Sequence, residues 1–239
     1  MNHPTITVIG TGYVGLTTAV LLAEVGHTVY ALDINKERLD TIKQGRSFFH
    51  EEGIDPLIAH AIKRGKLIPT SSYEKSIPNS TFIFSSVGTP DNPDGSSNLS
   101  YVFAAAKKAM SLMKPGSVYI QKSTVPVGTG EEIERLFNKS GQEIKYVSNP
   151  EFLREGTAIL DSLWFDRIVV GGNDKASCSA VLNLYKQIEV KRDELAKRAG
   201  IDGNGSQPGQ YFTTRRNSAE LIKVTANAFL AMRISFATS

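Results

Sequence analysis

The chain has 239 residues, of which 41% are hydrophobic and 21% charged, and its formal net charge is +3. This composition is typical of a globular protein, and a mild positive charge without a dense Lys/Arg run argues against nucleic-acid binding. The single cysteine excludes an internal disulfide and favours a cytoplasmic location, and the longest apolar stretch, interrupted by Arg233, is too short to span a membrane.

Up to residue 172, short β-branched runs alternate with helical patterns. This alternation is typical of parallel strands joined by right-handed crossovers. We therefore predict an α/β fold with a doubly wound, mostly parallel, Rossmann-like sheet followed by a long C-terminal helix. The predicted strands are 6–10, 28–33, 81–90, 117–123, 144–149 and 167–172, and the predicted helices are 13–25, 35–45, 55–65, 99–113 and 129–140.

Beyond residue 173 the pattern changes. Residues 174–200 are charged and helical, and residues 202–210 have the composition of a loop. A long Ala-rich helix then follows over 217–237, with Asn217 or Ser218 as its expected cap. We therefore predict a nucleotide-binding domain at 1–212, with a polar insertion at about 190–212, and the start of a long helix at 213–239. That helix has no stop signal, so we expect the chain to be shortened.

A glycine-rich turn follows the first predicted strand. Gly10, Gly12 and Gly15 form a G-x-G-x-x-G pattern, which lets a pyrophosphate approach the backbone at the start of a helix. Asp33 ends the next strand at about the spacing expected of a ribose-binding carboxylate. An acid there favours NAD over NADP, although Arg38 weakens this preference. The alternative is a glycine-rich turn with a chance acid.

Further polar segments follow the later strands. Thr89 in "VGTP" and Thr124 in "STVPVG" could each present a hydroxyl to a ligand, although each is a weak signal alone. In "NPEFLREG" we expect Asn149 to cap a short helix that places Glu151 and Glu155 one turn apart, an arrangement suited to proton handling. The alternative is two solvated surface acids.

The last helix carries Lys223 and Asn227 four positions apart, with Glu220 roughly on the same side. An ammonium and an amide on one helical face can hold an anion or oxyanion, although an ordinary polar stripe has the same pattern. The four histidines have no metal-ligand spacing, so we predict no metal site. Cys178 lies in a predicted helix, and we interpret it as a packing residue.

Several motifs together closely resemble the UDP-glucose/GDP-mannose dehydrogenase family: "VIGTGYVGLTTAVLLAEVGHTVYALDIN", "VGTP", "QKSTVPVGTG", "NPEFLREGTAILD", "DRIVVGG" and "AELIKVTANAFLAMRISF". The resemblance implies a four-electron oxidation in which two NAD molecules in turn take hydride from C6 of a nucleotide sugar, UDP-glucose being the expected substrate. It also implies a homodimer of the full-length enzyme, paired through the long helix.

The resemblance further implies roles for particular residues. It assigns proton transfer to Glu155, positioning of a water to Thr124, and substrate binding with oxyanion stabilisation to Lys223 and Asn227. The implied substrate-binding set also contains Glu151, Phe152 and Leu153. The implied NAD contacts are Gly10, Gly12, Tyr13, Val14, Gly15, Asp33, Arg38, Gly88, Thr89, Thr124 and Glu155.

The chain also departs from the family pattern. The family's catalytic cysteine segment and its second, nucleotide-sugar domain have no counterpart here, so we expect NAD binding without sustained oxidation. Three alternatives remain open: a non-catalytic NAD-binding module, a UDP-N-acetylmannosamine or GDP-mannose dehydrogenase, and a β-hydroxyacid dehydrogenase. The last of these fits "NPEFLREG" and "STVPVG" poorly.

Overall fold

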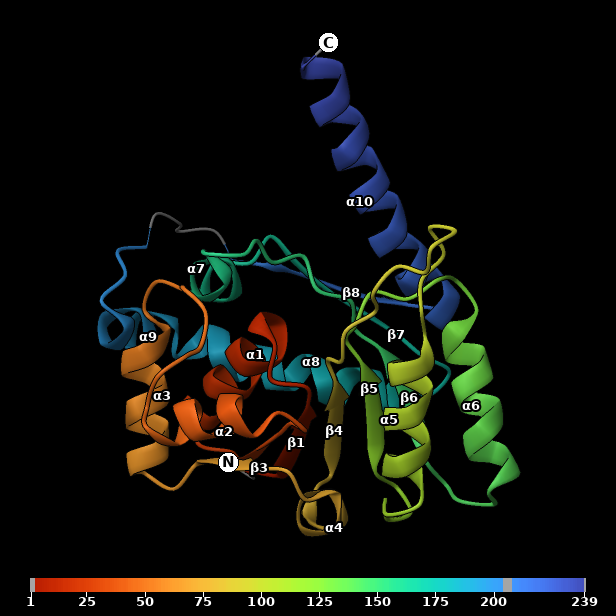
Figure 1. Ribbon diagram of the computed structural model, residues 1–239, viewed down its shortest axis with the longest axis horizontal. Coiled ribbons are helices and arrows are strands. Elements are labelled where there is room, and N and C mark those ends of the chain that lie inside the picture. Colours follow the sequence, from red (N-terminus) through yellow and green to blue (C-terminus); the bar gives the residue numbers. More distant parts are fainter. Residues whose placement is uncertain (1–2, 204–207, 239) are drawn as a thin grey trace.

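The computed structural model describes residues 3–203 and 208–238, which are built around one eight-stranded sheet in the order β3-β2-β1-β4-β5-β6-β7-β8 (Figure 1). Neighbouring strands are parallel except β6 and β7, so β7 and β8 run opposite to the rest. This confirms the predicted doubly wound, mostly parallel sheet. The strands are β1 (Thr5–Ile9), β2 (Thr28–Leu32), β3 (Leu67–Thr70), β4 (Phe82–Ser85), β5 (Val118–Gln121), β6 (Lys145–Ser148), β7 (Arg167–Gly171) and β8 (Gln210–Thr214).

Helices cover both faces of the sheet, and each face has its own apolar core. Because side chains alternate along a strand, Val118 and Ile120 enter the core with α1 and α8, whereas Tyr119 enters the core with α5 and α6. The helices are α1 (Tyr13–Glu24), α2 (Lys36–Lys43), α3 (Ile54–Lys63), α4 (Tyr73–Ser76), the 3-10 turn η1 (Ile77–Asn79), α5 (Ser100–Met110), α6 (Thr129–Lys139), α7 (Ala158–Leu163), α8 (Lys175–Val190), α9 (Arg192–Ala199) and α10 (Arg216–Ala237).

The sequence analysis missed the two edge strands. β3 contains Pro69, which lacks an amide donor, and it pairs only with β2, so the missing hydrogen bond falls at the sheet edge where proline is tolerated. β8 begins at Gln210, inside the region predicted as loop and insertion, and pairs only with β7. The predicted domain boundary after residue 212 thus falls within β8, and residues 204–207 of the predicted insertion lie outside the described residues.

The predicted short helix in "NPEFLREG" is wrong. Asn149 does not cap it, because its buried side chain donates to the Val169 carbonyl at 2.9 Å and accepts from the Tyr185 hydroxyl. Residues 149–157 instead form an irregular loop, and α7 begins at Ala158. Glu151 and Glu155 therefore share a loop rather than a helical face.

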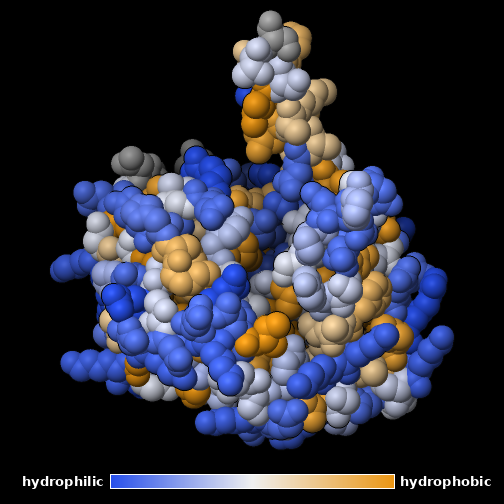
Figure 2. All heavy atoms as spheres, in the orientation of Figure 1, coloured by the Kyte–Doolittle hydropathy of each residue, from blue (hydrophilic) through white to orange (hydrophobic). Residues whose placement is uncertain are grey.

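The helix α10 leaves the body of the protein after about two turns (Figure 1). It begins at Arg216, and no side chain caps it, so the predicted cap at Asn217 or Ser218 is wrong. Beyond Lys223 most of its side chains are exposed, and Figure 2 shows apolar residues on this projecting part. No helix in the described ranges is both long enough and apolar enough to cross a membrane.

Candidate functional site

The sheet register brings the first residues after four strands to one edge. Gly10 follows β1, Ser86 follows β4, Lys122 follows β5 and Asn149 follows β6. The amides of the last three donate to the Ile9, Ser85 and Gln121 carbonyls of the neighbouring strands at 2.8 Å. Ligands of doubly wound sheets bind at the carboxyl ends of the strands, so this edge is the expected place for a site.

The three glycines of the turn differ in the space that a side chain would have at each position. Gly10 has a φ of 89°, and a Cβ there would lie 2.6 Å from the Ser86 carbonyl oxygen. A Cβ on Gly15 would lie 1.9 Å from the Gly10 carbonyl oxygen, so α1 packs directly on the turn. A Cβ on Gly12 would meet nothing within 4 Å. Space for a ligand is therefore open at the middle glycine, at the N-terminus of α1.

Asp33 lies beside this turn and is almost fully buried. Its Oδ2 accepts from both the amide and the hydroxyl of Thr11 at 2.7 Å, and its Oδ1 accepts from the Asn35 amide at 2.9 Å. Arg38 lies 3.9 Å from Oδ2 and over the Phe48 ring. The acid therefore holds the glycine turn in addition to facing the cavity, and sequence reasoning missed Thr11.

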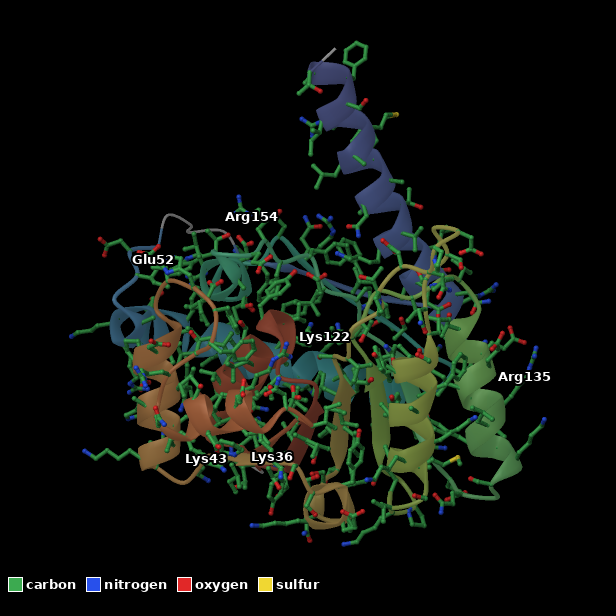
Figure 3. The ribbon with its side chains drawn as sticks, viewed as in Figure 1. Lys36, Lys43, Glu52, Lys122, Arg135 and Arg154 are labelled. Atoms are coloured by element: carbon green, nitrogen blue, oxygen red, sulfur yellow. The ribbon has the colours of Figure 1, made fainter. Side chains whose placement is uncertain are left out.

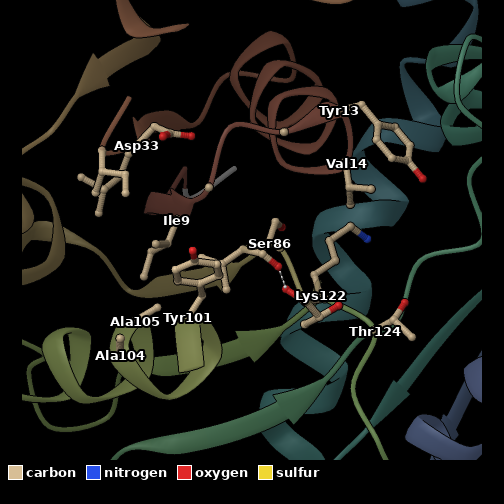
Figure 4. Close-up of a pocket in the computed structure, with 18 of the residues that line it drawn as sticks. Ile9, Tyr13, Val14, Asp33, Ser86, Tyr101, Ala104, Ala105, Lys122 and Thr124 are labelled. Carbon is tan, nitrogen blue, oxygen red and sulfur yellow. Dashed lines mark hydrogen bonds between the residues drawn. The ribbon is translucent and has the colours of Figure 1, made fainter. Parts of the chain in front are cut away.

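A cavity of about 660 Å³ runs along the sheet edge from Asp33 to Thr124. Figure 4 shows Asp33 on one side of it, and Lys122 and Thr124 on the other. Predicted cofactor-binding residues in its lining are Gly10, Gly12, Tyr13, Val14, Asp33, Arg38, Gly88, Thr89 and Thr124. The cavity thus brings together every such residue except Gly15, which packs beneath the turn, and Glu155.

A second cavity, of about 760 Å³, lies between the 149–157 loop, β7, α8 and α10. The predicted substrate-binding residues Glu151, Phe152, Leu153, Lys223 and Asn227 all line it. Within the described chain, only Lys122 and Glu151 line both cavities. These two side chains therefore mark the junction of the two spaces.

Glu151 is anchored at this junction through both carboxylate oxygens. Its Oε1 lies 3.0 Å from the Lys223 ammonium of α10, and its Oε2 accepts from the Leu153 amide at 2.6 Å. The Lys223 ammonium and the Arg167 guanidinium also lie over the Phe152 ring, at 5.4 and 4.4 Å from its centroid. The loop and α10, distant in sequence, thus form one cationic and aromatic wall.

Two acids, Glu155 and Glu220, do not lie where the sequence pattern predicts. Glu155 is exposed in the turn before Gly156 and lines neither cavity. It still acts near the site: burial raises the pKa of Tyr13 to about 12, and the negative charges of Glu151 and Glu155 add to that rise. Glu220 has partners other than those of Lys223: it accepts from the Gly128 and Gly130 amides at the start of α6.

Sequence reasoning also missed a buried polar chain. The Lys122 ammonium donates to the Tyr185 hydroxyl at 3.1 Å, and that hydroxyl donates to Asn149. The available signal was a lysine at the end of the predicted buried strand "SVYIQKS".

The described residues contain no group of three or more His, Cys, Asp or Glu side chains able to hold a metal ion. Cys178 is buried in α8, and burial raises the pKa of its thiol, with the Asp174 carboxylate adding to the rise. Both features agree with the interpretation of this cysteine as a packing residue.

A doubly wound sheet whose glycine turn opens beside a buried strand-end acid defines a dinucleotide-binding domain of the dehydrogenase type. Residues 4–189 match the model of the UDP-glucose/GDP-mannose dehydrogenase family, NAD binding domain. The chain belongs to this family, and NAD is its cofactor. The open space at Gly12 and the Asp33 carboxylate fit the pyrophosphate and a ribose of that cofactor.

Curated relatives and solved structures support the same family membership. The chain is 39% identical to a UDP-glucose 6-dehydrogenase of Rhizobium meliloti and to the UDP-glucose 6-dehydrogenase YwqF of Bacillus subtilis, over 97% of the chain and 50% and 49% of those proteins. A UDP-glucose dehydrogenase structure from Pyrobaculum islandicum has a TM-score of 0.86 at 33% identity, covering 99% of this chain and 52% of that one. The chain therefore spans about half the length of the relatives it matches.

Proposed function

We propose that the chain supplies the NAD-binding and acid–base part of a nucleotide-sugar 6-dehydrogenase, and that UDP-glucose is oxidised at C6 to UDP-glucuronate. The observation that carries this proposal is the junction, where a cofactor cavity and a second cavity meet at Lys122 and Glu151. A hydride can pass only where cofactor and substrate touch, so the reacting carbon belongs at this junction. The similarity to two UDP-glucose 6-dehydrogenases supports the choice of sugar.

The charge of the second cavity suits a nucleoside diphosphate group. The cations of its lining are Lys122, Arg154, Arg167, Lys223 and Arg233, and its acids are Glu151, Asp161 and Asp166. Arg154 is neutralised by a bidentate pair with Asp161, and Glu151 by Lys223. Arg167 and Arg233 have no ion pair among the described residues, so they are available to an anionic substrate.

Glu151 and the polar residues around the junction have distinct roles in this proposal. Two NAD molecules, bound in turn, would each take one hydride from C6. Both oxygens of Glu151 are engaged, so it holds substrate or water as a fixed acceptor. Lys223 and Asn227 lie one helical turn apart on α10 and stabilise the oxygen on which negative charge develops. Thr124 positions a water that takes the proton of the C6 hydroxyl, and the exposed Glu155 passes that proton on to solvent.

We also propose that α10 pairs with a second copy in the complete enzyme. Its projecting part exposes large apolar side chains, and such a surface on a folded protein marks an interaction site. The exposed large apolar side chains beyond Lys223 are Val224, Phe229, Leu230, Met232, Ile234 and Phe236.

The test is a fusion in which this chain replaces the matching half of the Bacillus subtilis relative. We expect the fusion to form NADH from UDP-glucose in preference to GDP-mannose and UDP-N-acetylmannosamine. K223M should lower that rate about 100-fold, since it removes an oxyanion-stabilising charge. K139M, a matched change at the exposed end of α6, should have no effect.

Two results would redirect the proposal. A folded fusion that binds NAD yet forms no NADH would favour a non-catalytic NAD-binding module. Preference for one of the other two sugars would move the proposal to that substrate.

A further inference from the structure

Lys122 is a buried cation that the proposed chemistry does not yet use. It is only 4% exposed, and Figure 3 places it inside the molecule, whereas Lys43, Arg135 and Arg154 extend from the surface. Lysine is rarely buried without a carboxylate partner, because an ammonium loses its hydration there. Among the described residues, Lys122 has no ion pair and one hydrogen bond, to Tyr185.

The hydrogen-bond direction leaves two donors of Lys122 free. An ammonium has three N–H donors, of which one goes to the Tyr185 hydroxyl. The hydroxyl donates its own hydrogen bond to the Asn149 side chain, so toward Lys122 it acts only as an acceptor. Figure 4 shows Lys122 at the end of the cofactor cavity away from Asp33.

The charge at the junction is also uncompensated. Glu151 and Lys223 neutralise each other at 3.0 Å, which leaves Lys122 as a net positive charge between the two cavities. With a ribose on Asp33 and the pyrophosphate at the glycine turn, the nicotinamide ring must lie at the Lys122 end.

We propose that Lys122 sets the preference of this site between the two redox forms of the cofactor. The oxidised ring carries one positive charge, which hydride removes. A fixed ammonium beside the ring repels the oxidised form and leaves the reduced form unaffected, so it favours transfer of hydride to NAD. The proposal rests on the proposed function in placing the nicotinamide at this junction.

The test compares dissociation constants for NAD and NADH, by calorimetry and by NADH fluorescence. K122M should tighten NAD relative to NADH by about tenfold, the effect of one charge at several ångströms in a partly solvated site. K122R keeps the charge and should keep the wild-type ratio. K108M removes a lysine lining the same cavity near Tyr73, at the adenosine end, and should alter both constants equally.

Melting curves confirm that each variant is folded, and K122Q replaces K122M if the methionine is not tolerated. An unchanged NAD-to-NADH ratio in a folded K122M or K122Q would overturn the role of Lys122 while leaving the cofactor site intact. If the wild-type chain bound neither form, the proposed function itself would fail.

Discussion

Replacing Asp33 with asparagine should destabilise the protein even without a cofactor. From the sequence, Asp33 is interpreted only as a ribose-binding residue. A residue with that role alone could lose its charge with little effect on the stability of the protein without NAD. The structure instead shows its two oxygens accepting from the Thr11 amide, the Thr11 hydroxyl and the Asn35 amide. An asparagine has one acceptor oxygen, so one of the two backbone amides must face an NH₂ group.

The magnitude follows from that lost acceptor. A buried donor left without a partner costs about 1–3 kcal/mol. For a domain of this size each kcal/mol lowers the melting temperature by roughly 2–4 °C. We therefore expect D33N to melt about 2–12 °C below the wild type without NAD. The rise in melting temperature that NAD produces should also shrink, because the charged ribose acceptor is gone.

The assay is thermal unfolding of the wild type and D33N, each with and without NAD. D40N is the matched control, since Asp40 is an exposed carboxylate on nearby α2 whose side chain, among the described residues, pairs only with Lys43. D40N should melt within about 1 °C of the wild type, as exposed pairs contribute little. Equal melting of D33N and the wild type without NAD would refute the structural role of Asp33.

Two further predictions concern the glycine turn and a buried histidine. G15A should lower the melting temperature even without NAD, because its Cβ would lie 1.9 Å from the Gly10 carbonyl oxygen. G12A should leave the melting temperature unchanged and weaken NAD binding, because its Cβ would enter open space. The reverse pattern in melting curves and NAD titrations would contradict the roles given to the two glycines. Burial, assisted by the charge of His3, lowers the pKa of His27 from 6.5 to about 4. Between these values the unfolded chain binds the proton and the folded chain does not, so stability should fall by about 3 kcal/mol as pH drops from 6.5 to 4. Denaturant unfolding of H27Q should lack that loss, and an equal loss would exclude His27 as its source.

The fold was predictable because its signals are local. β-branched runs, glycine stops and the turn at residues 10–15 each specify an element without reference to distant parts of the chain. The missed strands have no such signal: β3 carries a proline, and β8 is polar and becomes a strand only by pairing with β7. Edge pairing of this kind is a tertiary effect, so propensity alone could not find it.

A position near the end of a strand was enough to place a residue at the cavity, but not to show what its side chain contacts. Asp33 and Thr124 were expected at this edge, because the ends of parallel strands meet there, and both line the first cavity. Asn149 was misread as a helix cap, since its real partners, Val169 and Tyr185, come from β7 and α8. Lys122 was missed for the same reason: its significance depends on two cavities that no local pattern describes.

The position of Glu151 depends on how α10 is attached. Buried charges hold the first two turns of this helix: Arg216 pairs with Glu134, Glu220 caps the start of α6, and Lys223 binds Glu151. Burial raises the pKa of Glu220, whereas the two amides it accepts from and Arg216 oppose that rise. A shift of α10 would therefore have to break the cap on α6 before it moved Lys223 away from Glu151. Contacts remote from the junction thus keep the acid and the lysine together while the rest of α10 remains exposed.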